Sequence, residues 1–258
     1  MVKAKKHLGQ HFLTDESIAL DIVKALNEAN PKETILEIGP GTGVLTKYLV
    51  EEYNDRLMLI DLDRESVDYL HQHYPDLQDR TLYGDFIRKD IDYIPTDHFS
   101  IIGNFPYNIS SQIFFKVLEV KDRVDNVICM LQYEVAKRLV SPPGNKDYGI
   151  LSVLLQAYYK MEYLFDVEPH VFHPPPKVRS GVIRLIRNET ITLDCDEKLF
   201  KRVIKQGFQN RRKTLRNALK PLNLPPEVVE LEILNRRAET LSVDDFVLLS
   251  KQIENWNQ

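Results

Sequence analysis

Apolar residues in this chain fall into short continuous runs, separated by stretches in which they recur at helical spacing. The runs at residues 34–38, 56–60, 99–103 and 124–131 are typical of buried strands. Between the runs, apolar residues recur every three or four positions, which predicts helices with one buried face. This alternation of strand and helix indicates an α/β fold with a parallel, doubly wound sheet.

Further elements complete this pattern. A short strand is expected to end at Gly84-Asp85, and two more strands are expected at 161–167 and 180–187. Because no helix separates the last two, we predict that they form an antiparallel pair. Helices are expected after Thr14 or Asp15, after each of the first strands, at 133–140 and at about 148–158.

The stretch Asn104-Phe105-Pro106-Tyr107 directly follows one of the predicted buried strands. It therefore lies at the rim of the sheet, where such folds hold their active sites. The Asn side chain offers a carbonyl acceptor, the Pro fixes the direction of the preceding carbonyl, and the Tyr offers a flat face. Two acceptors beside a stacking surface suit the exocyclic amine of a base. Asn and Pro are also ordinary turn residues, so a plain strand-to-loop turn is the alternative.

A glycine turn and two carboxylates predict the cofactor. Gly39, Gly41 and Gly43 follow the first strand and let the backbone approach a ligand closely. Val44 stands where a dinucleotide-binding turn needs its third glycine, which disfavours a nicotinamide site. Asp61 ends the second strand, where it can accept hydrogen bonds from ribose hydroxyls, and Asp85 can accept from an adenine amino group. S-adenosylmethionine, a nucleoside without a pyrophosphate, fits these parts. The carboxylates could instead cap helices.

Composition limits the remaining possibilities. Hydrophobic residues make up 43% and charged residues 28% of the 258 residues, as in ordinary globular proteins. The net charge of −4 argues against a uniformly basic nucleic-acid-binding protein, so local clusters must do any such binding. Cys129 and Cys195 lie far apart and give no metal-ligand spacing, so no metal is expected. Neither a signal peptide nor an apolar run of about 18 residues is found, which predicts a cytoplasmic protein without a membrane segment.

Every charged residue between Lys198 and Lys220 is basic. A solvated helix face is the usual explanation of such a run, but a cluster of one sign also suits RNA phosphates. The residues predicted to bind RNA are Lys201, Lys205, Arg211, Arg212, Lys213 and Arg216. Residues 188–197 are polar and predict a linker between a domain at 1–187 and a small helical domain at 198–258.

Several blocks of the chain, in order, carry a resemblance to one family. They are Gly9-Gln10-His11-Phe12-Leu13, Leu36-Glu-Ile-Gly-Pro-Gly41, Ile60-Asp-Leu-Asp63, Gly84-Asp85, Asn104-Phe-Pro-Tyr-Asn-Ile-Ser110, Tyr148-Gly-Ile-Leu-Ser152, Phe172-His-Pro-Pro-Pro-Lys-Val-Arg-Ser180 and Phe208-Gln-Asn-Arg-Arg-Lys-Thr-Leu-Arg216. Together they make the chain similar, over nearly its whole length, to the small-subunit ribosomal RNA adenine dimethyltransferases (the kasugamycin-sensitivity dimethyltransferases).

The resemblance implies a Rossmann-like class I methyltransferase with a mostly parallel, seven-stranded sheet and a small C-terminal all-helical domain. It implies S-adenosylmethionine as cofactor and N6,N6-dimethylation of two adjacent adenines, in a hairpin loop near the 3′ end of small-subunit (16S) rRNA. The enzyme would act within an assembling small subunit, as a monomer, and contribute to subunit biogenesis. It also implies catalytic roles for Asn104, Phe105, Pro106 and Tyr107, with Phe172 as a second stacking face.

By the same resemblance, the cofactor-binding residues are Gln10, His11, Leu13, Glu37, Gly39, Gly41, Gly43, Asp61, Asp85 and Asn104. Three positions depart from the family pattern: His11 stands where Asn is usual, Asp61 where Glu is usual, and Phe105 where Leu is usual. The shorter Asp61 would need a small backbone shift to contact ribose.

Two other functions fit parts of the same sequence. The related large-subunit methyltransferases that confer macrolide resistance are the nearest enzymatic alternative, but the blocks at 148–152 and 174–178 favour the small-subunit enzymes. A non-catalytic RNA-binding or assembly factor on the same fold is the second alternative. The presence of both Asp85 and Asn104 speaks against it.

Overall fold

The computed structural model describes residues 2–255, which form two compact units. Unit 1 contains the residues up to Ala136 together with Lys160–Arg187. Unit 2 contains Lys137–Tyr159 together with the residues from Asn188 on. The segment 137–159, which the sequence assigned to the first domain, is thus grouped with the C-terminal residues.

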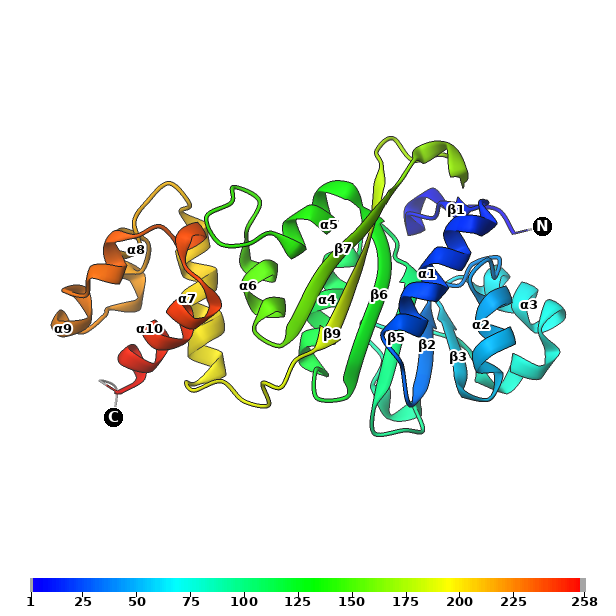
Figure 1. Ribbon diagram of the computed structural model, residues 1–258, viewed down its shortest axis with the longest axis horizontal. Helices are drawn as coiled ribbons and strands as arrows, with labels where there is room; N and C mark the ends of the chain where they lie inside the picture. The colour runs from blue at the N-terminus through cyan, green and yellow to red at the C-terminus, as the bar shows by residue number, and fades with distance from the viewer. Residues whose placement is uncertain (1, 256–258) are drawn as a thin grey trace. The chain divides into compact units, whose positions relative to one another are not determined.

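A seven-stranded sheet in the order β4-β3-β2-β5-β6-β9-β7 dominates Figure 1. The neighbouring pairs from β4 to β6 are parallel, and β9 is antiparallel to β6. The strands are β2 (Thr34–Ile38), β3 (Leu57–Asp61), β4 (Thr81–Tyr83), β5 (Phe99–Asn104), β6 (Val124–Gln132), β7 (Tyr159–Val167) and β9 (Ser180–Arg187). The predicted α/β fold with a mostly parallel sheet is confirmed.

The helices of unit 1 alternate with these strands, and the first of them precedes β2. They are α1 (Glu16–Glu28), α2 (Thr46–Tyr53), α3 (Arg64–His73), α4 (Ser110–Glu119) and α5 (Tyr133–Val140), which begins in unit 1. Asp15 caps α1, because its carboxylate accepts hydrogen bonds from the backbone amides of Ser17 and Ile18. Every residue of β2 and of β3 is buried, as expected for central strands of a sheet covered on both faces. On one face, Ile35 and Leu59 belong to the same core cluster as Ile22 of α1.

A second, two-stranded sheet was not predicted. It pairs β1 (Phe12–Leu13) with β8 (Phe172–His173) in antiparallel fashion, so the N-terminal residues lie beside a segment about 160 positions later in the chain. Strands of two residues carry too little periodicity to be detected from sequence.

Unit 2 is helical. It contains α6 (Ile150–Gln156), α7 (Glu197–Gln209), α8 (Leu215–Ala218), α9 (Pro226–Val229) and α10 (Val243–Asn255). The basic run predicted to be helical is broken between α7 and α8, where the amide of Lys213 donates to the carbonyl of Asn210 in a turn. At the start of α10, Ser242 and Asp245 form a reciprocal cap. Among the described helices, none has the length and apolar character needed to cross a bilayer.

Candidate active site

Parallel strands end at one edge of a sheet, and here that edge holds a cavity of about 290 Å³. It is lined by residues that follow β2, end β3, follow β4 and end β5, together with the N-terminal segment. Of the predicted site residues, the cavity is lined by Gln10, His11, Gly39, Gly41, Asp61, Asp85, Asn104, Phe105, Pro106 and Tyr107. Within residues 2–255, no group of His, Cys, Asp or Glu side chains is arranged to hold a metal ion.

The glycine turn after β2 forms the floor of the cavity. Gly39 and Gly41 both have positive φ angles, of 67° and 57°, which residues with side chains rarely adopt. A Cβ at Gly41 would lie 2.8 Å from Cε1 of Phe12, so the N-terminal segment can pack against this turn only if position 41 has no side chain. The turn therefore presents backbone rather than side chains to a ligand.

Asp61 ends β3 with its carboxylate almost fully buried. Its Oδ2 accepts a hydrogen bond from the Gly41 amide at 3.0 Å, and its Oδ1 accepts one from the Asp63 amide at 2.8 Å. Burial disfavours the charge and raises the pKa of Asp61 from 3.8 to about 6, although the two amides counteract it. The Leu62 amide also acts on this carboxylate, which has about four acceptor sites in all and so keeps acceptor capacity for a donor in the cavity.

Asp85 lies just beyond β4 and is partly exposed at the cavity wall. Its Oδ1 accepts from the Ile87 amide at 2.9 Å, and its Oδ2 lies 3.5 Å from Nε of Arg88. These contacts fix the carboxylate in a local turn and leave it accessible.

Asn104 ends β5, and its side-chain Nδ2 donates to the His11 carbonyl at 2.9 Å. Because a carbonyl can only accept, this bond determines which end of the Asn104 amide is Oδ1. Among the described residues, none donates to that Oδ1, so it remains an available acceptor. The imidazole of His11 donates from Nδ1 to the Pro174 carbonyl at 2.7 Å, because that carbonyl can only accept.

Of the residues after Asn104, Phe105 packs its ring in the core, whereas Tyr107 lies at the cavity. The Phe105 ring is 1% exposed and meets the Phe114 ring edge-on at 6.0 Å, so this departure from the family's Leu is accommodated in the core. Its amide donates to the Met130 carbonyl, which continues the sheet. The Tyr107 hydroxyl is hydrogen-bonded to Ser180 Oγ at 2.5 Å, and its ring centroid lies 5.4 Å from that of His11.

Four predicted site residues do not line this cavity. Leu13 and Phe172 are paired across β1 and β8, and both are buried in the core cluster. Phe172 is therefore packed inside the protein in this conformation, rather than presented as a stacking face. A Cβ at Gly43 would approach Tyr74 and Leu70 at 3.0 and 3.2 Å, so this glycine serves the packing of α3. Glu37 lies on β2 beneath the glycine turn.

The Glu37 carboxyl is fully buried and accepts a hydrogen bond from Thr46 Oγ1 at 2.6 Å. Burial raises its pKa from 4.5 to about 8, and the nearby Asp61 adds to the shift. The folded state therefore holds a proton that the unfolded state releases. This proton contributes fully to the free energy of unfolding below about pH 4.5. Between pH 4.5 and about 8 the free energy of unfolding falls by about 1.4 kcal/mol per pH unit, and above pH 8 the contribution is lost.

We predict that Glu37→Gln, which keeps the acceptor for Thr46 but cannot ionise, gains stability relative to the wild type as the pH rises. Chemical denaturation of the ligand-free protein between pH 5 and 8.5 measures the difference. Glu33→Gln, at an exposed position just before β2, is the matched control and should show no such trend. A difference between Glu37→Gln and wild type that does not change with pH would contradict the buried proton.

The basic residues of unit 2 are not equivalent. The Arg211 guanidinium donates to the carbonyls of Lys146 and Tyr148, at 2.8 and 2.6 Å. Arg216 donates to the Val229 carbonyl and to Oδ1 of Asn235. Both arginines therefore stabilise unit 2 itself.

Arg212 and Lys213 are exposed in the turn between α7 and α8. Within the described part of the chain, their side chains have no hydrogen-bond or ion-pair partner. Lys201 and Lys205 lie on α7, half-buried and exposed respectively.

Comparison with known proteins decides the family. Residues 1–255 match the family described as "Ribosomal RNA adenine dimethylase". The chain belongs to the ribosomal RNA adenine dimethylase family. Proteins from Cytophaga hutchinsonii and Flavobacterium johnsoniae, both named "Ribosomal RNA small subunit methyltransferase A", are each 53% identical to it, over 253 and 255 residues. These alignments cover 98% of this chain and 98% and 97% of the relatives.

Solved structures agree with this membership. A dimethyladenosine transferase from Plasmodium falciparum has a TM-score of 0.78 at 25% identity, covering 93% of this chain and 96% of that one. The 23S rRNA methyltransferase ErmE has a TM-score of 0.66 at 22% identity, covering 93% and 99% of the two chains, and shows the shared fold alone. The class I methyltransferase fold predicted from the sequence is confirmed.

Sequence reasoning missed the contacts that hold the N-terminal segment at the cavity. Lys5 and Gln10 both contact Asp63, and Asn108 donates to the His7 carbonyl. Asp63 could have been noticed as a helix cap directly after a strand, which α3 confirms. Its partner Lys5, 58 positions earlier, carries no local pattern that reveals the pair.

Proposed function

We infer that this protein is an S-adenosylmethionine-dependent adenine dimethyltransferase of small-subunit ribosomal RNA. The observation that carries this inference is the meeting of Asp61, Asp85 and Asn104 at one cavity, at the carboxyl edge of the sheet, in a chain of this family. By the resemblance, the target is the pair of adjacent adenines near the 3′ end of that RNA.

The cavity suits the nucleoside cofactor. The turn at Gly39 and Gly41 has no side chains and admits a ligand against the backbone, and the remaining acceptor capacity of Asp61 suits ribose hydroxyls. In this proposal Asp85, which lines the same cavity, accepts from the adenine amino group. S-adenosylmethionine supplies a methyl group on a sulfonium sulfur, and the protein residues hold and orient the two reactants.

Asn104 and Phe105 prepare the target amine in this proposal. The adenine N6 lone pair is delocalised into the ring, so the nitrogen is a poor nucleophile until its hydrogens are held and its geometry is bent. Oδ1 of Asn104 and the Phe105 carbonyl accept those hydrogens and stabilise the positive charge that develops on N6. The alkylated nitrogen then loses its proton to water, so the mechanism needs no strong protein base.

Tyr107 provides the flat face for the target base, a contact of about 1–3 kcal/mol in single-stranded binders. The base must reach the cavity unstacked, as it can in a hairpin loop. Phe172 can serve as the opposite face only if β8 moves, because its ring is 3% exposed.

Methyl transfer from labelled S-adenosylmethionine into undermethylated small subunits, with mapping of the product bases, tests the function. Dimethylation of adjacent adenines near the 3′ end of the small-subunit RNA is expected. Methylation of large-subunit RNA alone would instead support the macrolide-resistance activity, against which the names of the 53% identical relatives argue. A purified protein that binds no S-adenosylmethionine would support the non-catalytic alternative.

We propose that Arg212 and Lys213 contact RNA phosphates. Changing both to Gln is expected to flatten the dependence of log affinity on log salt, by somewhat under one unit per lost contact. Arg211→Gln should instead lower stability by about 1–3 kcal/mol, since it removes two charged hydrogen bonds within unit 2.

Filter binding over a salt series, with thermal unfolding of each variant, separates these effects. Lys32→Gln, an exposed lysine at the amino end of β2, is the control for loss of a positive charge. If the double variant has the salt slope of Lys32→Gln, the turn between α7 and α8 does not bind RNA.

The proposed setting is the cytosol, where the assembling small subunit would be the partner. Residues of one chain line the cavity, so the proposal requires only a monomer. We also propose a catalytic domain at 1–187, a linker at 188–197 and an RNA-binding domain at 198–258. Residues 137–159 lie within the first of these along the chain but group with the C-terminal residues in space.

A further inference from the structure

The N-terminal segment, residues 5–13, forms a wall of the cavity through its residues 7–12. It contains one short 3-10 turn (Lys6–Leu8) and the two residues of β1, too little regular structure to keep its conformation unaided. Its C-terminal end is held by the pairing of β1 with β8 and by Thr14, which donates to the Val171 carbonyl from both its amide and its hydroxyl. Its N-terminal end needs a separate anchor.

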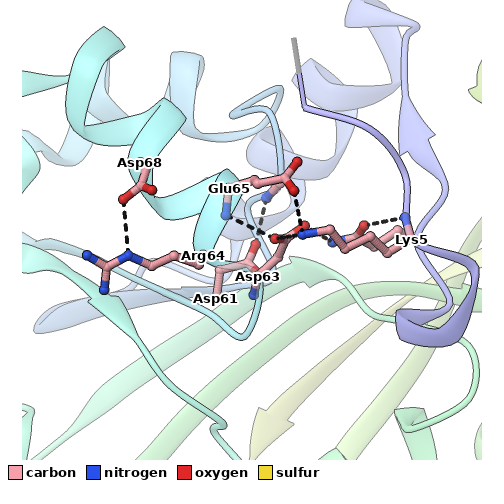
Figure 2. Close-up of polar contacts among 8 residues, drawn as sticks. Lys5, Asp61, Asp63, Arg64, Glu65 and Asp68 are labelled. Carbon is pink, nitrogen blue, oxygen red and sulfur yellow. Dashed lines mark hydrogen bonds and ion pairs between the residues drawn. The ribbon is translucent and has the colours of Figure 1, made fainter.

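Asp63 provides that anchor, and Figure 2 shows the Lys5 side chain reaching it. Lys5 Nζ lies 2.5 Å from Asp63 Oδ1, and Gln10 Nε2 donates to Asp63 Oδ2 at 3.0 Å. The Lys5 amide also donates to Gln10 Oε1 at 2.8 Å, and Nζ reaches Glu65 at 3.1 Å. The Asp63 side chain is fully buried, while that of Lys5 is 28% exposed. Both oxygens of one carboxylate thus hold the segment at two points.

This anchor is connected to the predicted ribose contact. The Asp63 amide donates to Asp61 Oδ1, and the Gly41 amide donates to Asp61 Oδ2. Gly41 in turn lies against the Phe12 ring of the N-terminal segment. Burial opposes ionisation of Asp63, but the hydrogen bonds from Lys5 and Gln10 outweigh it and hold the pKa of Asp63 below its usual value. The segment, the glycine turn and the Asp61 carboxylate form one network.

We propose that Lys5 and Asp63 are positioning residues for the cofactor: their ion pair holds the N-terminal segment closed against the cavity, where it completes the binding site. This proposal rests on the proposed function, because it takes the cavity to be the S-adenosylmethionine site. Without the ion pair, only a fraction of the molecules hold the N-terminal segment closed, and the apparent affinity for S-adenosylmethionine falls in proportion to that fraction. Bound cofactor restores closure, so the rate at saturation changes little.

The experiment compares Lys5→Met, Asp63→Asn, the double variant and wild type in the full-length protein. Asn retains the oxygen that caps α3 through the Glu65 amide, and Met retains most of the lysine stem. Lys6→Met is the matched control, since the neighbouring lysine is exposed and its loss changes the net charge equally. Calorimetry measures the Kd for S-adenosylmethionine, steady-state assays measure KM and kcat, and hydrogen exchange measures opening of residues 5–11 without ligand.

We expect Lys5→Met and Asp63→Asn each to raise Kd and KM by about tenfold, with kcat changed less than about twofold. The double variant should resemble each single variant, because the two residues act as one pair. Exchange of the segment's amides should accelerate in both, and Lys6→Met should match wild type in every measurement.

Equal Kd values for Lys5→Met and Lys6→Met, or additive effects in the double variant, would overturn the proposal. Unchanged exchange of residues 5–11 would also overturn it, and this measurement needs no cofactor. Failure of the wild type to bind S-adenosylmethionine would refute the proposed function instead. If Asp63→Asn does not fold, Lys5→Met still decides the matter, because the Lys5 side chain is partly exposed.

Discussion

Asn104→Ala is expected to lower kcat by about 100-fold or more, while binding of S-adenosylmethionine and of RNA largely persists. The reason is that Oδ1 of Asn104 is proposed to hold an amine hydrogen where positive charge develops, and the loss of one such group typically costs about 10²–10³ in rate. Single-turnover methyl transfer with saturating cofactor and RNA measures the chemical step directly.

The Asn104 amide also tethers the N-terminal segment through the His11 carbonyl, so its loss has a second consequence. Asn108→Ala is the matched control, because its Nδ2 donates to the His7 carbonyl of the same segment at 3.4 Å. A loosened segment affects both variants alike and acts on cofactor affinity. A much larger fall of kcat in Asn104→Ala than in Asn108→Ala would show that Oδ1 of Asn104 acts as the acceptor of the amine hydrogen. Similar kcat values in the two variants would refute that role.

Lowering the pH from 7.5 to 5 is expected to weaken binding of S-adenosylmethionine by about tenfold. The ribose hydroxyls require an ionised Asp61, and burial raises the pKa of this carboxyl to about 6 in the ligand-free protein. Below that pH, a proton must leave Asp61 before the cofactor binds, so Kd rises about tenfold per pH unit. Calorimetry across this pH range measures the dependence.

Other ionisable groups line the cavity, namely Asp85, His7 and His11, while Glu37 and Asp63 lie close to Asp61. Asp61→Asn should bind about 10–100-fold more weakly at pH 7.5, since it loses charged hydrogen bonds, and should show no dependence on pH between 5 and 7.5. His11→Asn, which restores the family's usual residue, should keep the dependence. If Asp61→Asn retains the dependence, another group is responsible.

Much of the fold could be predicted from local sequence, because strands buried on both faces are written as continuous apolar runs. The runs that became β2, β3, β5 and β6 stand out as continuous apolar segments, and their parallel arrangement follows from the helices between them. The same logic located Asp61, Asp85 and Asn104, since each lies at the carboxyl end of a predicted strand or just beyond it.

The sequence was less informative wherever a role depends on distant partners. Glu37 and Asp61 both belong to family blocks, yet the structure places only Asp61 at the cavity. Arg211 and Arg212 are adjacent basic residues, but one is engaged by carbonyls of the 146–148 segment and the other is exposed. Phe172 matches a family motif and is nevertheless packed in the core.

By itself, the sequence determined the order of the main strands and helices along the chain, the edge of the sheet that holds the candidate site and the resemblance to the family. These features depend on periodicity and on motifs of a few neighbouring residues. Only the tertiary structure decided that residues 7–12 line the cavity and that Lys5 meets Asp63. Such contacts join residues far apart in the chain, and their energy arises from burial and geometry that exist only after folding.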